Sequence, residues 1–167
     1  MREQVEIVEA ESREDLLTYH EMVKASGERK EFGPPPLAEY EAVWDIYRPK
    51  NMAKIFLAKW KGKCVAGTQV VAHRKTLQAT SAGSFKEGWP ARPSDFLHWK
   101  IMEWAIQEGF WYYNLGGAFS PSLIQWKKEF NANTENIRKY DKVFFPKTKS
   151  TIGRVYGAAI TVKRVFK

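Results

Sequence analysis

Hydrophobic and polar residues recur along the first part of the chain with two different periods, which predict a strand followed by a helix. Val5 and Ile7 alternate with charged residues over residues 4–9, as in a strand with one exposed face. An S-x-x-D sequence at residues 12–15 is typical of the first turn of a helix. Apolar residues then recur at helical spacing, so we expect a helix that ends at Gly27.

A proline-rich loop, a second helix and three strands are expected next. Residues 28–36 include three consecutive prolines, which cannot donate the hydrogen bonds of a helix or a sheet. Aromatic and apolar residues at helical spacing then predict a helix that closes before Pro49. Three apolar segments joined by short turns predict an antiparallel meander, and they are residues 53–60, 64–73 and 76–84.

The rest of the chain alternates helices with strands. The predicted elements are a loop at 85–93, a helix capped by Ser94 and ended by Gly109, a strand at 110–115, a short helix from Pro121 to about Phe130, a strand at 137–145 and a basic amphipathic helix within 147–167. The full order is βααβββαβαβ with an added C-terminal helix. It indicates an α/β (α+β) fold with a mixed sheet, in a single domain of residues 1–167.

This order of elements resembles the GNAT acyltransferase fold. The resemblance implies that two central parallel strands, here residues 76–84 and 110–115, splay apart and that the acyl donor lies in the gap. It also implies an Arg/Gln-x-x-Gly-x-Gly/Ala turn that holds the acyl-CoA pyrophosphate where the central helix begins. Residues 86–94 have one glycine and two prolines there, and prolines remove amide donors. An acyl-CoA N-acyltransferase with a degenerate turn, using acetyl-CoA, is therefore the alternative.

Composition excludes several classes of protein. The 167 residues include Trp 7, Tyr 7 and Phe 10, which is too many aromatic residues for a disordered chain. Cys64 is the only cysteine, which excludes a disulfide scaffold, and no apolar run reaches the ~18 residues of a membrane span. The N-terminal residues are acidic and alternating, unlike a signal peptide. We therefore expect a cytoplasmic protein.

The net charge of +8 favours anionic partners. Positive charge is concentrated between residues 127 and 167, which hold eleven Lys and Arg against three acidic residues. This stretch has three interpretations: it contacts tRNA phosphates, it rests on the acidic inner face of a membrane, or it is a solvated helix that covers the sheet edge.

Four segments in a fixed order resemble one branch of the GNAT fold more specifically. They are Arg29-Lys-Glu-Phe32, Leu97-His-Trp-Lys-Ile-Met-Glu-Trp-Ala, Gly109-Phe-Trp-Tyr-Tyr-Asn-Leu-Gly-Gly117 and Ile124-Gln-Trp-Lys-Lys-Glu-Phe130. They resemble the Fem family of peptidoglycan-bridge aminoacyltransferases, also called non-ribosomal peptidyltransferases. The resemblance runs from about Val5 to Phe145. Such enzymes usually carry two GNAT-like domains, and this chain resembles the second of them.

The resemblance implies an aminoacyltransferase active in cell-wall biogenesis. Its donor would be aminoacyl-tRNA, its acceptor an amine on a UDP-linked or lipid-linked muropeptide, and no cofactor would be needed. The chain resembles only the second domain of the family, so it is either a single-domain relative, which could pair with a partner domain or form a homodimer, or an excised piece of a longer protein. Two positions depart from the family pattern: Asn131 stands where glycine is frequent, and Trp126 where phenylalanine is usual.

The reaction itself indicates what the site must supply. Aminoacyl transfer from an ester to an amine passes through a tetrahedral oxyanion, so the protein must position the reactants and stabilise negative charge. Trp126 and Lys127 offer a cation beside an aromatic ring, and we expect Lys127 to stabilise the developing negative charge. The alternative places Lys127 on the solvated face of its helix and Trp126 in the core.

Other candidates would bind substrate. A guanidinium at Arg29 can bind phosphate bidentately, and the resemblance places Arg29, with Phe32, at the precursor. Tyr113 is one of two adjacent tyrosines on a strand, and the family pattern favours it as a hydrogen-bond donor near the acceptor peptide. Gly116 and Gly117 would let the substrate backbone approach closely. The structural alternatives are that Arg29 is a surface residue of the loop, that Tyr113 is packed in the sheet, and that the two glycines form a plain turn.

No residue pattern supports a metal site or a convincing general base. His20, His73 and His98 are far apart in the sequence, and neither HxxxH nor CxxC occurs. The general base could therefore come from another chain or from the substrate, and both possibilities stay open. So does a third hypothesis, a non-catalytic module that binds tRNA or a partner enzyme.

Overall fold

The computed structural model describes residues 5–29, 33, 35–118 and 120–135. Phe32, the predicted strand at 137–145 and the predicted helix within 147–167 lie outside the described residues. Packing divides the chain into two units, Met1–Lys127 and Lys128–Lys167, and the fold below is that of the first unit. The prediction of one domain over the whole chain stays a prediction.

The described elements follow the predicted order. They are β1 (Glu6–Glu9), α1 (Arg13–Arg29), α2 (Leu37–Ile46), the short 3-10 helix η1 (Arg48–Lys50), β2 (Ala53–Trp60), β3 (Lys63–His73), β4 (Thr76–Ser84), a second 3-10 helix η2 (Lys86–Ala91), α3 (Pro93–Gln107), β5 (Tyr112–Asn114) and α4 (Pro121–Lys128). The predicted α/β class with a mixed sheet is confirmed.

The described strands form a sheet in the order β1-β2-β3-β4-β5. Neighbours are antiparallel from β1 to β4, which confirms the predicted meander. In contrast, β4 and β5 are parallel and pair over a short stretch, from Thr76 opposite Tyr112 to Gln78 opposite Asn114. A parallel pair requires a crossover connection, and α3 provides it.

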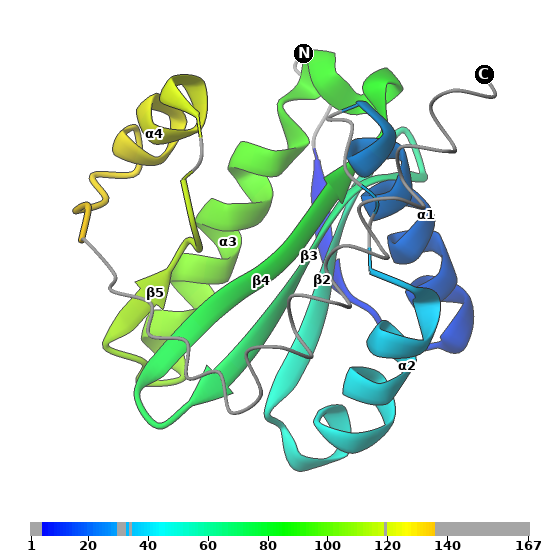
Figure 1. The fold of residues 1–167 in the computed structure, drawn as a ribbon, viewed down its shortest axis with the longest axis horizontal. Helices are drawn as coiled ribbons and strands as arrows, with labels where there is room; N and C mark the ends of the chain where they lie inside the picture. Colours follow the sequence, from blue (N-terminus) through cyan, green and yellow to red (C-terminus); the bar gives the residue numbers. More distant parts are fainter. Residues whose placement is uncertain (1–4, 30–32, 34, 119, 136–167) are drawn as a thin grey trace, which may run out of the picture. The chain divides into compact units, whose positions relative to one another are not determined.

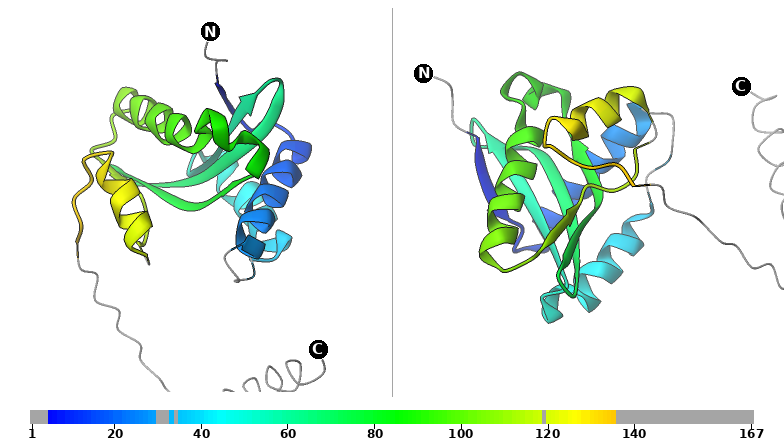
Figure 2. Two further views of the ribbon diagram at one scale, coloured as in Figure 1. Left: turned by 90° about the horizontal axis from the view of Figure 1, so that it is seen from above. Right: turned by 90° about the vertical axis from the view of Figure 1, so that its left-hand side faces the viewer.

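Helices cover both faces of the sheet because side chains along β2 alternate between the faces. Ile55 and Leu57 pack with residues of α1 and α2, whereas Phe56 and Ala58 pack with residues of α3. Figure 1 shows α3 on one side of the sheet and α1 with α2 on the other. The left-hand view of Figure 2 shows the same three layers from above.

Helix α1 begins as predicted but ends later. Ser12 Oγ accepts the Asp15 N–H at 3.1 Å, and Asp15 Oδ2 accepts the Ser12 N–H at 3.0 Å, which is the reciprocal capping pattern. The prediction that Gly27 ends the helix is wrong, because α1 continues to Arg29. Two side chains of its last turn form hydrogen bonds with β4, which holds this turn in place.

The connection from β4 to α3 also differs from the prediction. It forms η2 instead of an irregular loop, and Gly88 packs so closely that a Cβ there would lie 2.5 Å from Val65 Cβ. The predicted cap at Ser94 is wrong as well. Arg92, in the left-handed conformation, is the N-cap residue, and Pro93 begins the helix because proline needs no N–H partner there.

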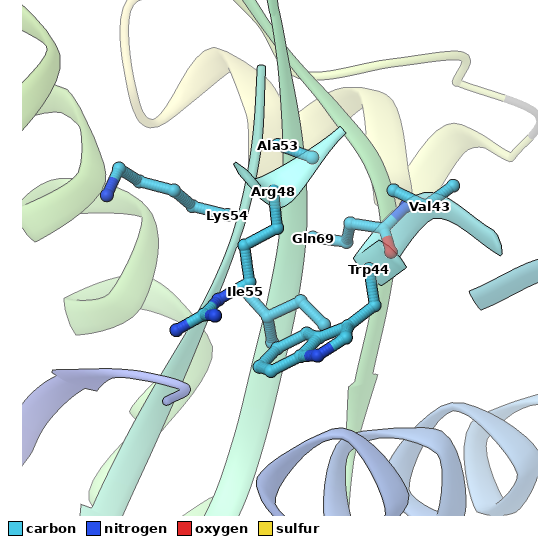
Figure 3. Close-up of a pocket in the computed structure, with 7 residues that line it drawn as sticks. All are labelled: Val43, Trp44, Arg48, Ala53, Lys54, Ile55 and Gln69. Atoms are coloured by element: carbon cyan, nitrogen blue, oxygen red, sulfur yellow. The ribbon is translucent and has the colours of Figure 1, made fainter. Parts of the chain in front are cut away.

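A small cavity lies between α2, η1, β2 and β3. Its volume is about 10 Å³, so a single water molecule is the largest occupant it admits. Figure 3 shows its lining, with Arg48 beside Trp44, and the guanidinium carbon is 4.3 Å from the ring centroid. Gln69 contributes a buried Oε1 that has no hydrogen-bond partner within the described part of the chain. A substrate site must therefore lie elsewhere.

Candidate active site

A cleft opens where β4 and β5 separate. Beyond Gln78 and Asn114 the two strands no longer pair, and Figure 1 shows them side by side at one end only. The cleft has a volume of about 940 Å³, large enough for a substrate. Its lining comes from the last turn of α1, the second half of β4, η2, α3, the turn after β5, and α4. The strand predicted at 110–115 is shorter, because β5 spans Tyr112–Asn114 and pairs with β4 over its whole length. The predicted gap beside the second half of β4 is present because the chain leaves the sheet after Asn114.

Lys127 lies in the wall of this cleft and is only 8% exposed. Its Nζ donates hydrogen bonds of 2.7 Å to the carbonyl oxygens of Leu115, Gly116 and Gly117. An ammonium group has three N–H donors, so these carbonyl groups use all of them. The alternative of a solvated helix face is thereby excluded. Burial lowers the pKa of Lys127, whereas the three carbonyl groups favour its charged form.

The turn after β5 is held from two sides. The Gly116 N–H donates to Asn114 Oδ1 at 2.8 Å, while Lys127 binds the carbonyl groups. Gly116 has φ +76°, a left-handed conformation that glycine adopts without strain. The residues from Leu115 to Gly117 therefore form a fixed wall of the cleft.

His98 is a buried residue of α3 that also lines the cleft, and it is 4% exposed. Its Nδ1 lies 2.7 Å from the Tyr113 hydroxyl, and its ring meets the Trp126 ring edge-on at a centroid distance of 5.2 Å. Burial, reinforced by the charge of Lys127 and opposed by Asp95, lowers the pKa of His98 to about 4. Burial raises the pKa of Tyr113. Both side chains are therefore neutral near pH 7.

Trp126, on α4, packs against His98 and helps to position it. Its indole Nε1–H donates to Asp95 Oδ1 at 2.7 Å, and the other carboxylate oxygen of Asp95 accepts a hydrogen bond from Arg92. The indole is thus fixed at one end by a charged acceptor while its ring packs against His98. Asp95 thereby links α3 to α4.

The shifted pKa of His98 predicts that stability falls on acidification. Below pH 6.5 the unfolded chain protonates this histidine, whereas the folded chain does not until about pH 4. Over this window the folded state loses on the order of 3 kcal/mol. Urea unfolding at pH 7, 5.5 and 4 measures the loss, which should be smaller in His98→Gln. His73→Gln, at an exposed position, is the control. An unchanged slope in His98→Gln would refute the assignment.

The second half of β4 presents main-chain groups to the cleft. The Ser84 N–H donates to Ser26 Oγ, and its carbonyl accepts from Arg29, so both groups point away from β3. Main-chain groups two residues apart on a strand point the same way. The Ala82 N–H is therefore directed toward the open edge, where β5 no longer pairs.

Arg29 and Trp89 lie where β4 ends. Arg29 Nη2 donates to Ser26 Oγ at 2.8 Å and to the Ser84 carbonyl at 2.7 Å. Its guanidinium carbon is 5.3 Å from the centroid of the Trp89 ring. Both residues line the cleft, so Arg29 is not merely a loop surface residue.

The structure brings most of the predicted site residues together. Those that line the cleft are Arg29, Gly116, Gly117, Trp126 and Lys127, while Tyr113 is bonded to His98, which lines it. The sequence interpretation missed His98, Asp95 and Trp89. The helical spacing could have indicated His98. It lies on the same face of α3 as Ile101 and Ala105, so the pattern predicts that this polar side chain is buried.

The described part of the chain contains no group of three or more His, Cys, Asp or Glu side chains that could hold a metal ion. Within the same residues, no helix is both long and apolar enough to cross a membrane.

Comparison with known proteins identifies the family. The profile of the acetyltransferase (GNAT) domain matches residues 2–128. No curated protein is similar enough to count as a match.

Solved structures share the fold. A possible acetyltransferase from Clostridium difficile 630 is 16% identical with a TM-score of 0.69, and the match covers 84% of this chain and 98% of that one. FemX is 15% identical with a TM-score of 0.67, and the match covers 74% of this chain but 49% of FemX. Glucosamine-6-phosphate N-acetyltransferase from Arabidopsis thaliana is 12% identical with a TM-score of 0.60, covering 86% and 100%.

At such identities these structures support the fold alone, whereas the family profile covers well over half of the chain. The sheet with its separated central strands agrees with that profile. The chain therefore belongs to the acetyltransferase (GNAT) domain family of acyltransferases.

Proposed function

We propose that this chain is an aminoacyltransferase of the Fem type, which moves an amino acid from aminoacyl-tRNA to an amine of a peptidoglycan precursor peptide. The observation that carries the proposal is the start of α3, where an acyl-CoA enzyme would hold the pyrophosphate of its donor on backbone amides. Pro93 has no N–H, and the Asp95 N–H already donates to the Arg92 carbonyl at 3.1 Å. The Asp95 carboxylate itself lies in this first turn, where Arg92 and Trp126 already donate to it.

The open edge of β4 is the surface on which the acyl group would lie. The carbonyl oxygen of the donor ester would accept a hydrogen bond from the Ala82 N–H, a preorganised donor for the oxyanion of the tetrahedral intermediate. The fixed turn at Gly116 and Gly117 forms the other wall, where the acceptor peptide would approach. Holding both reactants in one cleft supplies much of the rate enhancement for an ester that is already activated.

The acceptor amine must lose a proton, and His98 is our candidate acceptor for it. It is neutral near pH 7, and the hydrogen bond to Tyr113 fixes its ring orientation. Its low pKa makes it a weak base for a free ammonium group. It is better suited to the nitrogen of the tetrahedral adduct, which is more acidic. The adduct then collapses as the ester C–O bond breaks, and the proton passes to the departing ribose oxygen of the tRNA. Tyr113 is then a positioning residue for His98.

Lys127 acts in this proposal through the turn that it binds. Its three donors are already used by carbonyl groups, so its charge raises the local positive potential without a direct bond to the oxyanion. Arg29 would bind a phosphate of the substrate, and we keep Phe32 as a neighbouring substrate contact.

Partners and location follow from the same proposal. The acceptor would be a UDP-linked or lipid-linked muropeptide, reached in the cytoplasm or at the inner face of the membrane. The basic stretch after Lys127 would contact tRNA or that face. FemX is about twice as long as the matched segment, which supports a partner domain or a second copy. No cofactor is required.

Acyl transfer from acetyl-CoA is the second candidate. It is favoured by the similarity to the two acetyltransferase structures. It requires the donor pyrophosphate to bind away from the start of α3. Arg29 and Lys86, which both line the cleft, are the basic residues available for that.

The test supplies the full chain with a mixture of charged tRNAs and a UDP-muropeptide, or with acetyl-CoA and the same acceptor, and analyses the product by mass spectrometry. We expect the muropeptide to gain the mass of one aminoacyl residue, and His98→Gln to slow this by at least about 100-fold. A gain of an acetyl group would support the second candidate instead. No product with either donor would contradict both, and it would favour a binding module.

A further inference from the structure

We infer that Trp89 and Arg29 form a nucleotide subsite of the cleft, in which a nucleobase stacks on the Trp89 indole and the adjacent phosphate binds the Arg29 guanidinium. The inference rests on the proposed function only in taking this cleft as the substrate site.

Trp89 is fixed in place although it is 51% exposed. Its Nε1–H donates to Ser84 Oγ at 3.2 Å, and its carbonyl accepts the Arg92 N–H at 2.9 Å. The preceding residue, Gly88, is packed tightly on Val65. An aromatic side chain that is held in this way and left half in solvent offers a flat surface on which a ligand can stack.

Arg29 is fixed as well, and it has donors to spare. Both of its hydrogen bonds use Nη2. Within the described residues, Nε and Nη1 have no partner and no carboxylate pairs with the guanidinium. The N–H groups of Nε and Nη1 are therefore available to donate to phosphate oxygens, and the positive charge of the guanidinium strengthens such hydrogen bonds.

The charges around this pair favour an anion. Lys86 also lines the cleft and adds a second positive charge. Glu28 and Glu87, the acidic residues next in sequence to these two basic residues, are exposed and do not belong to the lining. An anionic group that enters the cleft here therefore meets positive charge.

The combination of a cation and a flat ring identifies the chemical class. Arg29 already lies over the Trp89 ring, but Trp89 is still 51% exposed. A lipid pyrophosphate or a peptide carboxylate would bind Arg29 and leave that exposed surface uncovered. A nucleoside phosphate uses both, and stacking of a base on an aromatic side chain contributes roughly tenfold or more to affinity. Such a ligand can come from the adenosine of CoA or of the tRNA 3′ end, or from the uridine of a UDP-linked acceptor.

Titration calorimetry of the full chain at low salt tests the subsite with three probes: ADP, UDP and inorganic pyrophosphate. We expect one of the nucleotides to bind at least about tenfold more tightly than pyrophosphate. Trp89→Leu should remove this difference and leave the pyrophosphate affinity unchanged, whereas Arg29→Gln should weaken both. Preference for UDP identifies a UDP-linked acceptor. Preference for ADP identifies an adenosine, which can belong to CoA or to the tRNA 3′ end. Competition between CoA and an RNA hairpin that ends in CCA then shows which of the two binds.

Two matched variants control for general effects. Trp99→Leu removes another exposed tryptophan, on α3, and Arg48→Gln removes another arginine that lies over a tryptophan ring. Neither residue lines the cleft, so both variants should bind nucleotides like the parent. Thermal melts verify that every variant is folded.

The subsite is overturned if the parent binds no nucleotide, if pyrophosphate binds as tightly, or if Trp89→Leu keeps the nucleotide preference. These outcomes do not depend on turnover. Nucleotide binding without an aminoacylated product would retain the subsite and reject the proposed function, and the product without nucleotide preference would do the reverse.

Discussion

Lys127→Met is expected to destabilise the protein by roughly 3 kcal/mol or more and to lower aminoacyl transfer by at least about 100-fold. The methionine keeps the length of the side chain but removes three hydrogen bonds. The carbonyl groups of Leu115, Gly116 and Gly117 then lose their donor in a partly buried turn. Because this turn is a wall of the cleft, both stability and transfer should fall. Urea unfolding and the mass-spectrometric assay measure the two effects.

Rescue by small amines separates the two roles of Lys127. Lys127→Ala leaves space for an ammonium ion between the same carbonyl groups, so ammonium or methylammonium should raise both its melting temperature and its activity. Tetramethylammonium, which has no N–H, should do neither. Lys128→Met, at the exposed neighbouring position, is the control for the loss of one charge. If Lys127→Met lost activity at an unchanged melting temperature, a direct role on the oxyanion would replace the role in the turn.

Gly83→Ala is expected to destabilise the fold by at least about 3 kcal/mol. Gly83 lies on β4 where α1 crosses it most closely. A Cβ there would lie 2.3 Å from the Val23 nitrogen, 2.4 Å from the Met22 carbonyl carbon and 2.5 Å from the Met22 oxygen. These are backbone atoms, which cannot rotate away as a side chain can. The helix would have to move off the sheet, and the bonds of its last turn to Ser84 would be lost.

A matched glycine variant isolates this effect. Gly33→Ala adds the same methyl group where no atom of the described residues lies within 4 Å, so its melting temperature should stay within a few degrees of the parent. Denaturant unfolding of both variants gives the comparison. Equal stabilities would mean that α1 and β4 are not packed as closely as the structure places them.

Periodicity predicted most helices and strands, and it was least accurate where an element ends. Glycine is frequent where helices end, but two hydrogen bonds from the last turn of α1 to β4 stabilise the helix beyond Gly27 and outweigh the low helix propensity of glycine. Serine often caps helices, yet the N-cap residue is Arg92, two positions before Ser94, and Pro93 begins the helix. In both places a neighbouring residue or a distant strand decided the boundary.

The site was predicted less completely than the fold. Lys127 and Arg29 came from a resemblance between motifs, and the sequence did not indicate which atoms they bind. His98 was passed over because no second histidine lies near it in the chain. Its partner Tyr113 is fifteen residues away and reaches it only because β5 runs beside α3.

The sequence by itself determined the order of elements and the two faces of the sheet, because alternation and helical spacing reflect local geometry that each segment carries alone. Only the tertiary structure decided that Lys127 is buried among three carbonyl groups, that His98 is neutral, and that Arg29 lies over Trp89. Those properties depend on desolvation and on contacts between residues far apart in the chain, and neither is encoded in the pattern of a single segment.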